Sequence, residues 1–109
     1  MAIYNYQTVT IASGQTDSGA IDLQGHTIVG IQLPAAMTGA TVAILESQTV
    51  GGTYRPVNLN GTATTYTATA STTIAVPHTN SMCVQFAKIR SASAEGADRA
   101  ITVISRVID

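Results

Sequence analysis

Hydrophobic and polar residues alternate with a period of two along most of the chain, which is the pattern of β-strands with one buried face. In "YQTVTIA" Val9 and Ile11 alternate with threonines, and "GAIDL" places Ile21 and Leu23 on the face opposite Asp22. The alternation continues through "ATVAILES", "TTIAVP" and "RAITVISRVI". No window repeats apolar residues at the spacing of an amphipathic helix. The pattern therefore predicts an all-β protein.

Two segments carry specific expectations about which side chains share a face. "TIVGIQLP" predicts Val29, Ile31 and Leu33 on one face, with Gly30 and Gln32 on the other. In "MCVQFAKIRS" the alternation assigns three residues to one face of a strand: Met82, Val84 and Phe86.

Turn-forming residues separate the predicted strands. "ASGQTDSG", "PAAMTG", "NLNG" and "SASAEGAD" are rich in Gly, Pro, Asn, Asp and Ser, which favour turns. Eight or nine short strands with turns at this spacing predict a single β-sandwich or barrel. No helix falls between strands, so the sheets are expected to be mostly antiparallel. Pro56 confines the short strand "TYRPV" to an edge or a bulge.

Residues 60–87 contain no Asp, Glu, Lys or Arg and are rich in Thr. Such a stretch is either a low-complexity linker or a folded surface without charge. Because its β-branched residues and its Ile74 and Val76 alternate with small polar ones, we interpret it as two or three strands.

Charged residues are scarce throughout the chain. They make up 10% of its 109 residues, five basic and six acidic, with a net charge of −1. A folded monomer of this size exposes roughly 5,700 Å², and so neutral a surface favours association. Five scattered basic residues are too few for nucleic acid or an anionic membrane. The start of the chain is not a secretory signal, no apolar run could span a membrane, and the single cysteine fits a reducing cytoplasm.

No residue cluster predicts a reaction. Cys83 lies in an alternating segment and is expected to be a buried core thiol. His26 and His78 are far apart and lack a metal-ligand spacing. Glu95 and Asp98 share one loop but are too few to hold calcium. We therefore expect no catalytic residue, no cofactor and no metal.

Aromatic and basic residues provide the candidate contacts with a partner. Tyr4 and Tyr6 share one face of the first predicted strand, and tyrosine is enriched at protein interfaces. Lys88 and Arg90 also share a face, and ion pairs are expected to fix the register between the last two strands. Residues 1–12 are expected to form an extended arm or a first strand at a subunit interface. The candidate interface residues are Ile3, Tyr4, Tyr6, Tyr66, Arg90 and Arg106.

Two stretches resemble small virion proteins of tailed bacteriophages. They are "SGAIDLQGHTIVGIQLPAAMTGATVAILES", followed by a Gly-containing hairpin, and "KIRSASAEGADRAITVISRV". The resemblance implies a jelly-roll-like sandwich that is made in the host cytoplasm and built into the particle. Proteins of this kind decorate or cement capsids, commonly as trimers that bridge major capsid proteins.

The leading hypothesis is thus a non-enzymatic capsid decoration or cement protein that acts as a homo-oligomer, with a trimer favoured. Its partners would be the major capsid protein or other virion proteins. The alternative is a carbohydrate- or receptor-binding module of a fibre or neck. This alternative predicts a shallow site on loops such as "PHTNS" or "SASAEGAD", and a glycan array distinguishes the two hypotheses. Arg90 and Arg106 could contact an acidic neighbour or a sugar.

Overall fold

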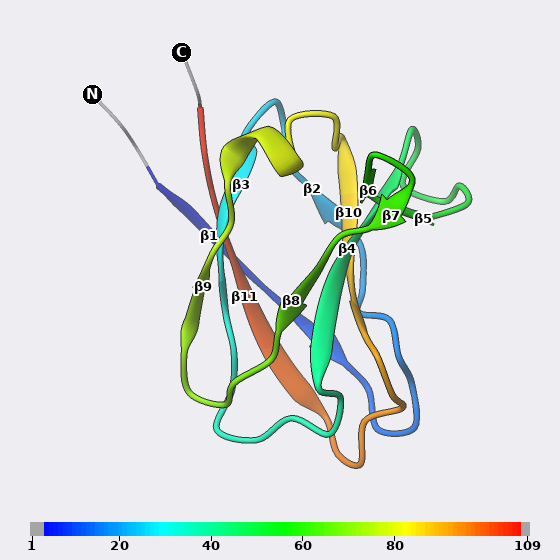
Figure 1. Ribbon diagram of the computed structural model, residues 1–109, viewed down its shortest axis with the longest axis vertical. Helices are drawn as coiled ribbons and strands as arrows, with labels where there is room; N and C mark the ends of the chain where they lie inside the picture. Colours follow the sequence, from blue (N-terminus) through cyan, green and yellow to red (C-terminus); the bar gives the residue numbers. More distant parts are fainter. Residues whose placement is uncertain (1–3, 108–109) are drawn as a thin grey trace.

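The computed structural model describes residues 4–107, which form two antiparallel β-sheets packed face to face (Figure 1). The first sheet contains, in spatial order, β1 (Asn5–Ile11), β11 (Arg99–Arg106), β3 (Thr27–Gln32) and β9 (Thr73–Ala75). The second sheet contains, in spatial order, β2 (Ile21–Asp22), β10 (Phe86–Ser91), β4 (Thr41–Ser47) and β5 (Arg55–Pro56). A further strand, β8 (Thr65–Thr67), also pairs with β4. The predicted all-β, antiparallel sandwich is confirmed.

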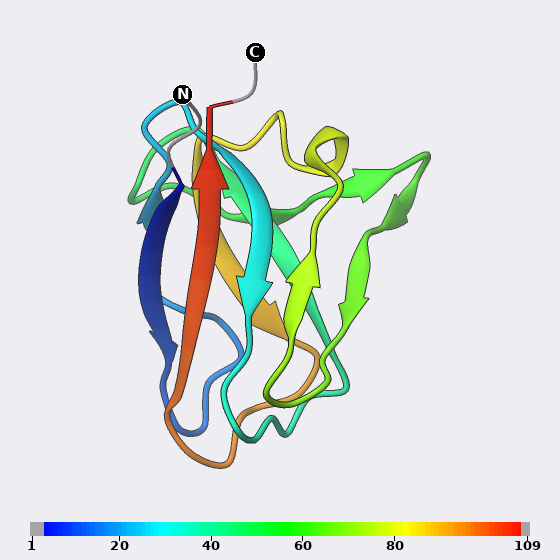
Figure 2. The same cartoon turned by 90° about the vertical axis from the view of Figure 1, so that its left-hand side faces the viewer.

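Two short elements lie outside the main sheets. The hairpin of β6 (Asn58–Leu59) and β7 (Thr62–Ala63) projects from the sandwich (Figure 2). Its turn needs positive φ at Asn60 and Gly61, with values of 55° and 85°, and this Asn-Gly pair adopts them readily. The 3-10 helix η1 spans His78–Asn80. No helix in the described part of the chain is long and apolar enough to cross a membrane.

The described residues contain eleven strands, whereas eight or nine were expected. The difference arises at the projecting hairpin, where β6 and β7 are strands of only two residues each. β5, which contains Pro56, pairs only with β4 and lies at a sheet edge, as predicted. Residues 60–87 include β7, β8 and β9, so the interpretation as strands rather than a linker is confirmed.

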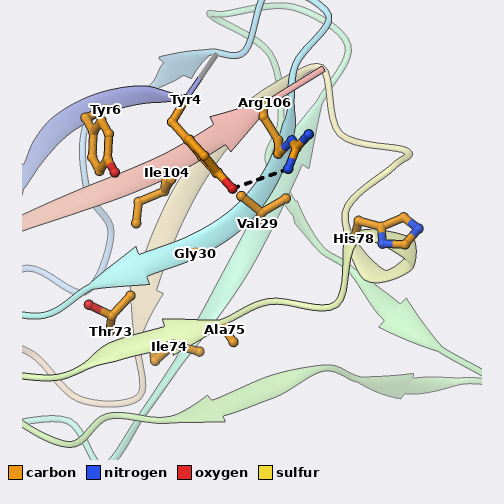
Figure 3. A pocket seen from close by; sticks show the side chains of 10 residues that line it. All are labelled: Tyr4, Tyr6, Val29, Gly30, Thr73, Ile74, Ala75, His78, Ile104 and Arg106. Atoms are coloured by element: carbon orange, nitrogen blue, oxygen red, sulfur yellow. Dashed lines mark hydrogen bonds between the residues drawn. The ribbon is translucent and has the colours of Figure 1, made fainter. Parts of the chain in front are cut away.

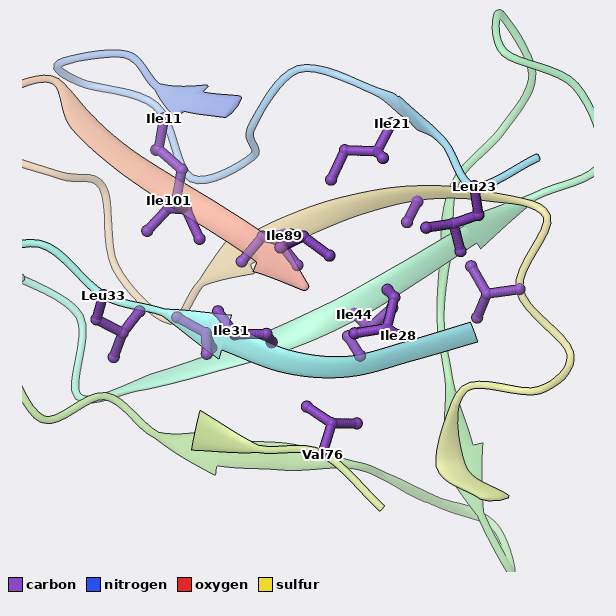
Figure 4. Packing of buried hydrophobic residues seen from close by; sticks show 14 residues of the cluster. Ile11, Ile21, Leu23, Ile28, Ile31, Leu33, Ile44, Val76, Ile89 and Ile101 are labelled. Atoms are coloured by element: carbon purple, nitrogen blue, oxygen red, sulfur yellow. The ribbon is translucent and has the colours of Figure 1, made fainter. Parts of the chain in front are cut away.

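The core is a layer of aliphatic side chains between the two sheets (Figure 4). The longer strands contribute alternate residues, and the predicted inward positions Ile11, Ile21 and Leu23 are fully buried. The largest fully buried aliphatic residues also include Ile28, Ile31, Ile44, Ile89 and Ile101. Burial of such side chains contributes about 1.5–3 kcal/mol each, which explains why the period-two pattern determines the fold class.

A β-bulge changes the face of one residue in β3. Ile104 pairs with Gly30 and Ser105 pairs with Ile28, so the register skips Val29. Side chains on both sides of a bulge no longer alternate simply. Val29 therefore joins Gly30 on the outer face, and the prediction that it shares a face with Ile31 was wrong.

The segment before β10 is a turn rather than the start of a strand. Val84 N–H donates to the Ser81 carbonyl at 3.2 Å, and the buried Ser81 hydroxyl donates to the Ile28 carbonyl at 2.7 Å. The strand begins only at Phe86, on the face opposite Ala87 and the buried Ile89. The predicted shared face of residues 82, 84 and 86 was therefore wrong. The turn also leaves Cys83 exposed, so it is not the expected core thiol.

The expected ion pairs between the last two strands do not form, because β10 and β11 belong to different sheets. Arg90 instead binds Asp17 in a bidentate pair, with nitrogen–oxygen distances of 2.7 and 3.1 Å. This pair lowers the pKa of Asp17, because the carboxylate accepts the Arg90 hydrogen bonds. Arg99, the first residue of β11, pairs with Glu95 of the preceding loop at 2.9 Å.

Candidate interaction surface

A shallow groove of about 420 Å³ crosses the outer face of the first sheet (Figure 3). Residues of β3, β9 and β11, together with Tyr4 and Tyr6 at the start of β1, form its walls. We call it the tyrosine groove and define it by Tyr4, Tyr6, Val29, Ile74, Ile104 and Arg106.

The strand period places the tyrosines in this groove. Residues 5, 7, 9 and 11 of β1 are more buried than their neighbours, so the even-numbered side chains point outward. Tyr4 and Tyr6 are consequently 50% and 58% exposed. A monomer gains little from aromatic rings exposed to this extent, whereas an interface would bury them.

The apolar floor of the groove is assembled by long-range pairing. Ile104 of β11 lies opposite Gly30 on one side of β3, and Ala75 of β9 lies opposite Gly30 on the other side. Ile74 pairs with the buried Ile31 and packs partly against the core, so it only borders the groove at the edge strand β9. A Cβ atom on Gly30 would approach Ile104 Cδ1 to 3.1 Å, so glycine gives Ile104 room to lie across β3. The bulge adds Val29 to the same floor.

Arg106 provides the positive charge of the groove. Its guanidinium lies 5.2 Å from the centroid of the Tyr4 ring, and Nη1 donates to the Tyr4 hydroxyl at 3.3 Å. This cation–π contact holds the two side chains together. Within residues 4–107 no carboxylate lies within ion-pair distance of Arg106, and its buried Nε has no hydrogen-bond acceptor. The groove thus combines two rings, an apolar floor and a cation suited to a carboxylate.

The structure gathers only some of the predicted interface residues. Tyr4, Tyr6 and Arg106 converge in the groove. Tyr66 lies on β8, packs partly against the core, and its hydroxyl accepts from Asn80 Nδ2 at 3.4 Å. Arg90 lies on the second sheet, where Asp17 binds it. The prediction for Ile3 lies outside the described residues.

Glu95 is the most strongly bound carboxylate among the described residues, with 1% of the residue exposed. It accepts the backbone N–H groups of Thr38 and Gly39 at 2.8 and 2.9 Å, the Ser91 hydroxyl at 2.6 Å and Arg99 Nε at 2.9 Å. Burial alone would raise its pKa, but these hydrogen bonds together lower the pKa to about 2. Glu95 therefore joins two loops.

The other candidate groups lie outside the strands. Asp98, the second carboxylate of the Glu95 loop, accepts Ser13 N–H at 2.8 Å. His78 lines one end of the groove, while Cys83 is exposed in the turn that follows. Among residues 4–107, no three His, Cys, Asp or Glu side chains are grouped to hold a metal ion.

Comparison of the chain with protein-family models, with curated protein sequences and with solved structures finds no match. The tyrosine groove is thus identified from the sequence and the geometry of this chain. Sequence reasoning found its tyrosines and its arginine but not Val29, Ile74 or Ile104. Their alternation predicted strands, but it could not show that three distant strands share one outer surface.

Proposed function

We propose that the protein is a non-enzymatic structural protein of a bacteriophage particle, a decoration or cement protein that binds the head and bridges capsid subunits. The tyrosine groove carries this proposal, because it is an exposed, largely apolar surface without a reactive group. Tyrosine and arginine are the residues most often found at the energetic centre of protein interfaces. The resemblance of two chain segments to small virion proteins supports the same function.

We also infer that the sandwich is a jelly roll. Its first sheet has the order β1-β11-β3-β9, and the second has the order β2-β10-β4-β8 when β5 is set aside. This arrangement of eight strands in two antiparallel sheets is the one expected for a jelly roll, with β5, β6 and β7 as an insertion between β4 and β8. A jelly-roll sandwich of this kind suits a protein that binds its partners through the outer faces of its sheets.

Charge favours a protein partner at this surface. Residues 1–16 contain no charged side chain, so Arg106 is the charge that a partner covering the start of β1 would meet. Arg106 remains available for an Asp or Glu of the major capsid protein. An interface of about 800 Å² per partner is of standard size, and many copies on one particle gain further by multivalency.

Replacing Tyr4 and Tyr6 together by alanine is expected to weaken binding to particles that lack the protein by at least about tenfold, as for residues at the centre of an interface. The matched control replaces both by phenylalanine. It keeps the rings and loses only the bond to Arg106, so binding is expected to persist. Cosedimentation with purified particles measures both variants.

Wild-type affinity of the alanine variant would exclude the groove as the capsid contact. Point substitutions are a sharper test than deletion of the first seven residues, because that deletion removes Asn5–Gln7 of β1 and their pairing with β11. Copy number on purified particles is the complementary measurement. Hundreds of copies would support decoration, whereas about a dozen or fewer would indicate a neck or fibre position.

The two exposed rings favour a second candidate function, a carbohydrate- or receptor-binding module of a fibre or neck. Tyr4 and Tyr6 could stack on a saccharide while Arg106 donates to its oxygens. The lack of tryptophan argues against this candidate. A glycan array is the direct test, and binding of a glycan that the alanine variant fails to bind would favour this function over decoration.

A further inference from the structure

The outer edge of β1 is the longest free sheet edge in the described part of the molecule. β1 pairs on one side with β11 over seven residues, from Asn5 to Ile11. On its other side its backbone forms an isolated bridge only at its end, between Ile11 and Ser18, and the Gln7 side chain donates to the Asp22 carbonyl of β2 at 3.1 Å. Figure 2 shows β1 at the margin of the first sheet. Unpaired backbone groups along such an edge are a template for another strand.

The remaining edges differ from this one in length. The first sheet ends on its other side at β9, which has three residues, and the second sheet ends at strands of two or three residues: β2, β5 and β8. Short edge strands are a common protection against unwanted pairing. β1 has none of the usual protections, since it contains no charge, no proline and no register shift.

The hydrogen bonds define which backbone groups of β1 are free. The Thr10 carbonyl accepts Gly19 N–H at 3.3 Å, so the backbone N–H and C=O groups of Thr10 are directed away from β11. Along a strand, the backbone N–H and C=O groups of successive residues are directed to opposite edges. Those of the odd-numbered residues therefore bond to β11, and those of Tyr6 and Thr8 are directed to the free edge. Each of these two residues therefore presents one donor and one acceptor.

We propose that two copies of the chain pair antiparallel through the free edges of β1 and join their first sheets into one continuous sheet. A two-fold axis at Gln7 sets Tyr6 of each copy opposite Thr8 of the other. Both residues direct their backbone N–H and C=O groups to the free edge, so each Tyr6–Thr8 pair exchanges two backbone hydrogen bonds. The segment that covers Thr10 limits the pairing to this central part of β1.

A second copy suits this edge better than an unrelated strand. A two-fold interface must be self-complementary, and antiparallel pairing of an identical strand meets that condition in the backbone itself. Residues 1–16 carry no charge, so no like charges face each other across the axis. Pairing would also place two tyrosine grooves on one continuous face. The proposal does not depend on the identity of the bound particle, and it replaces the three-fold assembly expected from the sequence resemblance.

The first test removes one donor from the free edge. Thr8→Pro lacks the outward N–H, and it leaves the odd-numbered N–H groups that face β11 in place. It also loses the bond between the Thr8 and Thr102 hydroxyls, so Thr8→Val, which loses that bond but keeps the N–H, is the matched control. We expect the wild type and Thr8→Val to sediment as dimers, and the dimer of Thr8→Pro to dissociate at least about tenfold more readily.

Sedimentation is measured with a reducing agent, since Cys83 is exposed and would otherwise link copies by oxidation. A monomeric or trimeric wild type would overturn the proposal. So would a Thr8→Pro variant that is folded by circular dichroism and as dimeric as Thr8→Val.

The second test uses the wild-type protein and does not depend on the folding of a variant. Amide hydrogen exchange resolved by residue is expected to show protection of Tyr6 and Thr8 in concentrated protein, lost at least about tenfold on dilution. Gln7 and Val9 should stay protected at both concentrations, because their N–H groups face β11. Fast exchange of Tyr6 and Thr8 at every concentration would contradict pairing through this edge.

Discussion

Replacing Glu95 by alanine is expected to lower the free energy of unfolding by about 3–5 kcal/mol, the range found when one partner of a buried ion pair is removed. The substitution leaves Arg99 without its carboxylate and Thr38 and Gly39 N–H without an acceptor. The Ser91 hydroxyl loses its partner as well. Urea denaturation followed by circular dichroism measures the loss.

Two further variants make this result specific. Glu95→Gln keeps the shape and one acceptor oxygen but loses the charge, so its stability should lie between the wild type and Glu95→Ala. Glu46→Ala removes a half-buried carboxylate from β4 and is expected to cost less than about 1 kcal/mol. If Glu95→Ala were no less stable than Glu46→Ala, the role of Glu95 in joining the loops would be refuted.

Acidification is expected to destabilise the protein through the same residue. The folded-state pKa of Glu95, about 2, lies below its ordinary value of 4.5. A lowered pKa contributes stability that is fully present above pH 4.5 and is lost as the pH falls toward 2. The difference between these two values corresponds to about 3 kcal/mol. Asp17, whose pKa is also lowered, contributes in the same direction.

The measurement is the urea midpoint at a series of pH values from neutral to about pH 2, near the folded pKa. Glu95→Gln is the control, because its amide does not titrate, and it should lose clearly less stability on acidification than the wild type does. Equal losses in the two proteins would mean that other carboxylates dominate the acid response.

The fold class could be predicted from the sequence because the core is uniform. The long strands contribute aliphatic residues to one layer between the sheets, as Ile11 and Ile101 illustrate. The period-two alternation within each strand is therefore enough to predict the sandwich core. The wrong assignments at Val29 and Cys83 both depend on distant partners. Val29 turns outward because β11 shifts its register there, and Cys83 is exposed because the preceding Ser81 hydroxyl binds β3.

The candidate surface was predictable only in part, for a similar reason. Tyr4 and Tyr6 stand two residues apart, and this spacing alone puts them on one face of a strand. Arg106 lies a hundred residues away in sequence, yet its place beside Tyr4 follows from the pairing of β1 with β11. The role of Glu95 had no sequence signal, because three of its partners come from backbone groups and a serine.

The pairing of Asn5 with Ser105 also determines how the domain responds to force. Because β1 and β11 are antiparallel neighbours, the start of one and the end of the other meet at the same corner. Tension applied between these two ends peels β1 from β11 one pair of hydrogen bonds at a time instead of shearing all of them together. The sandwich therefore offers little mechanical resistance when pulled by its ends.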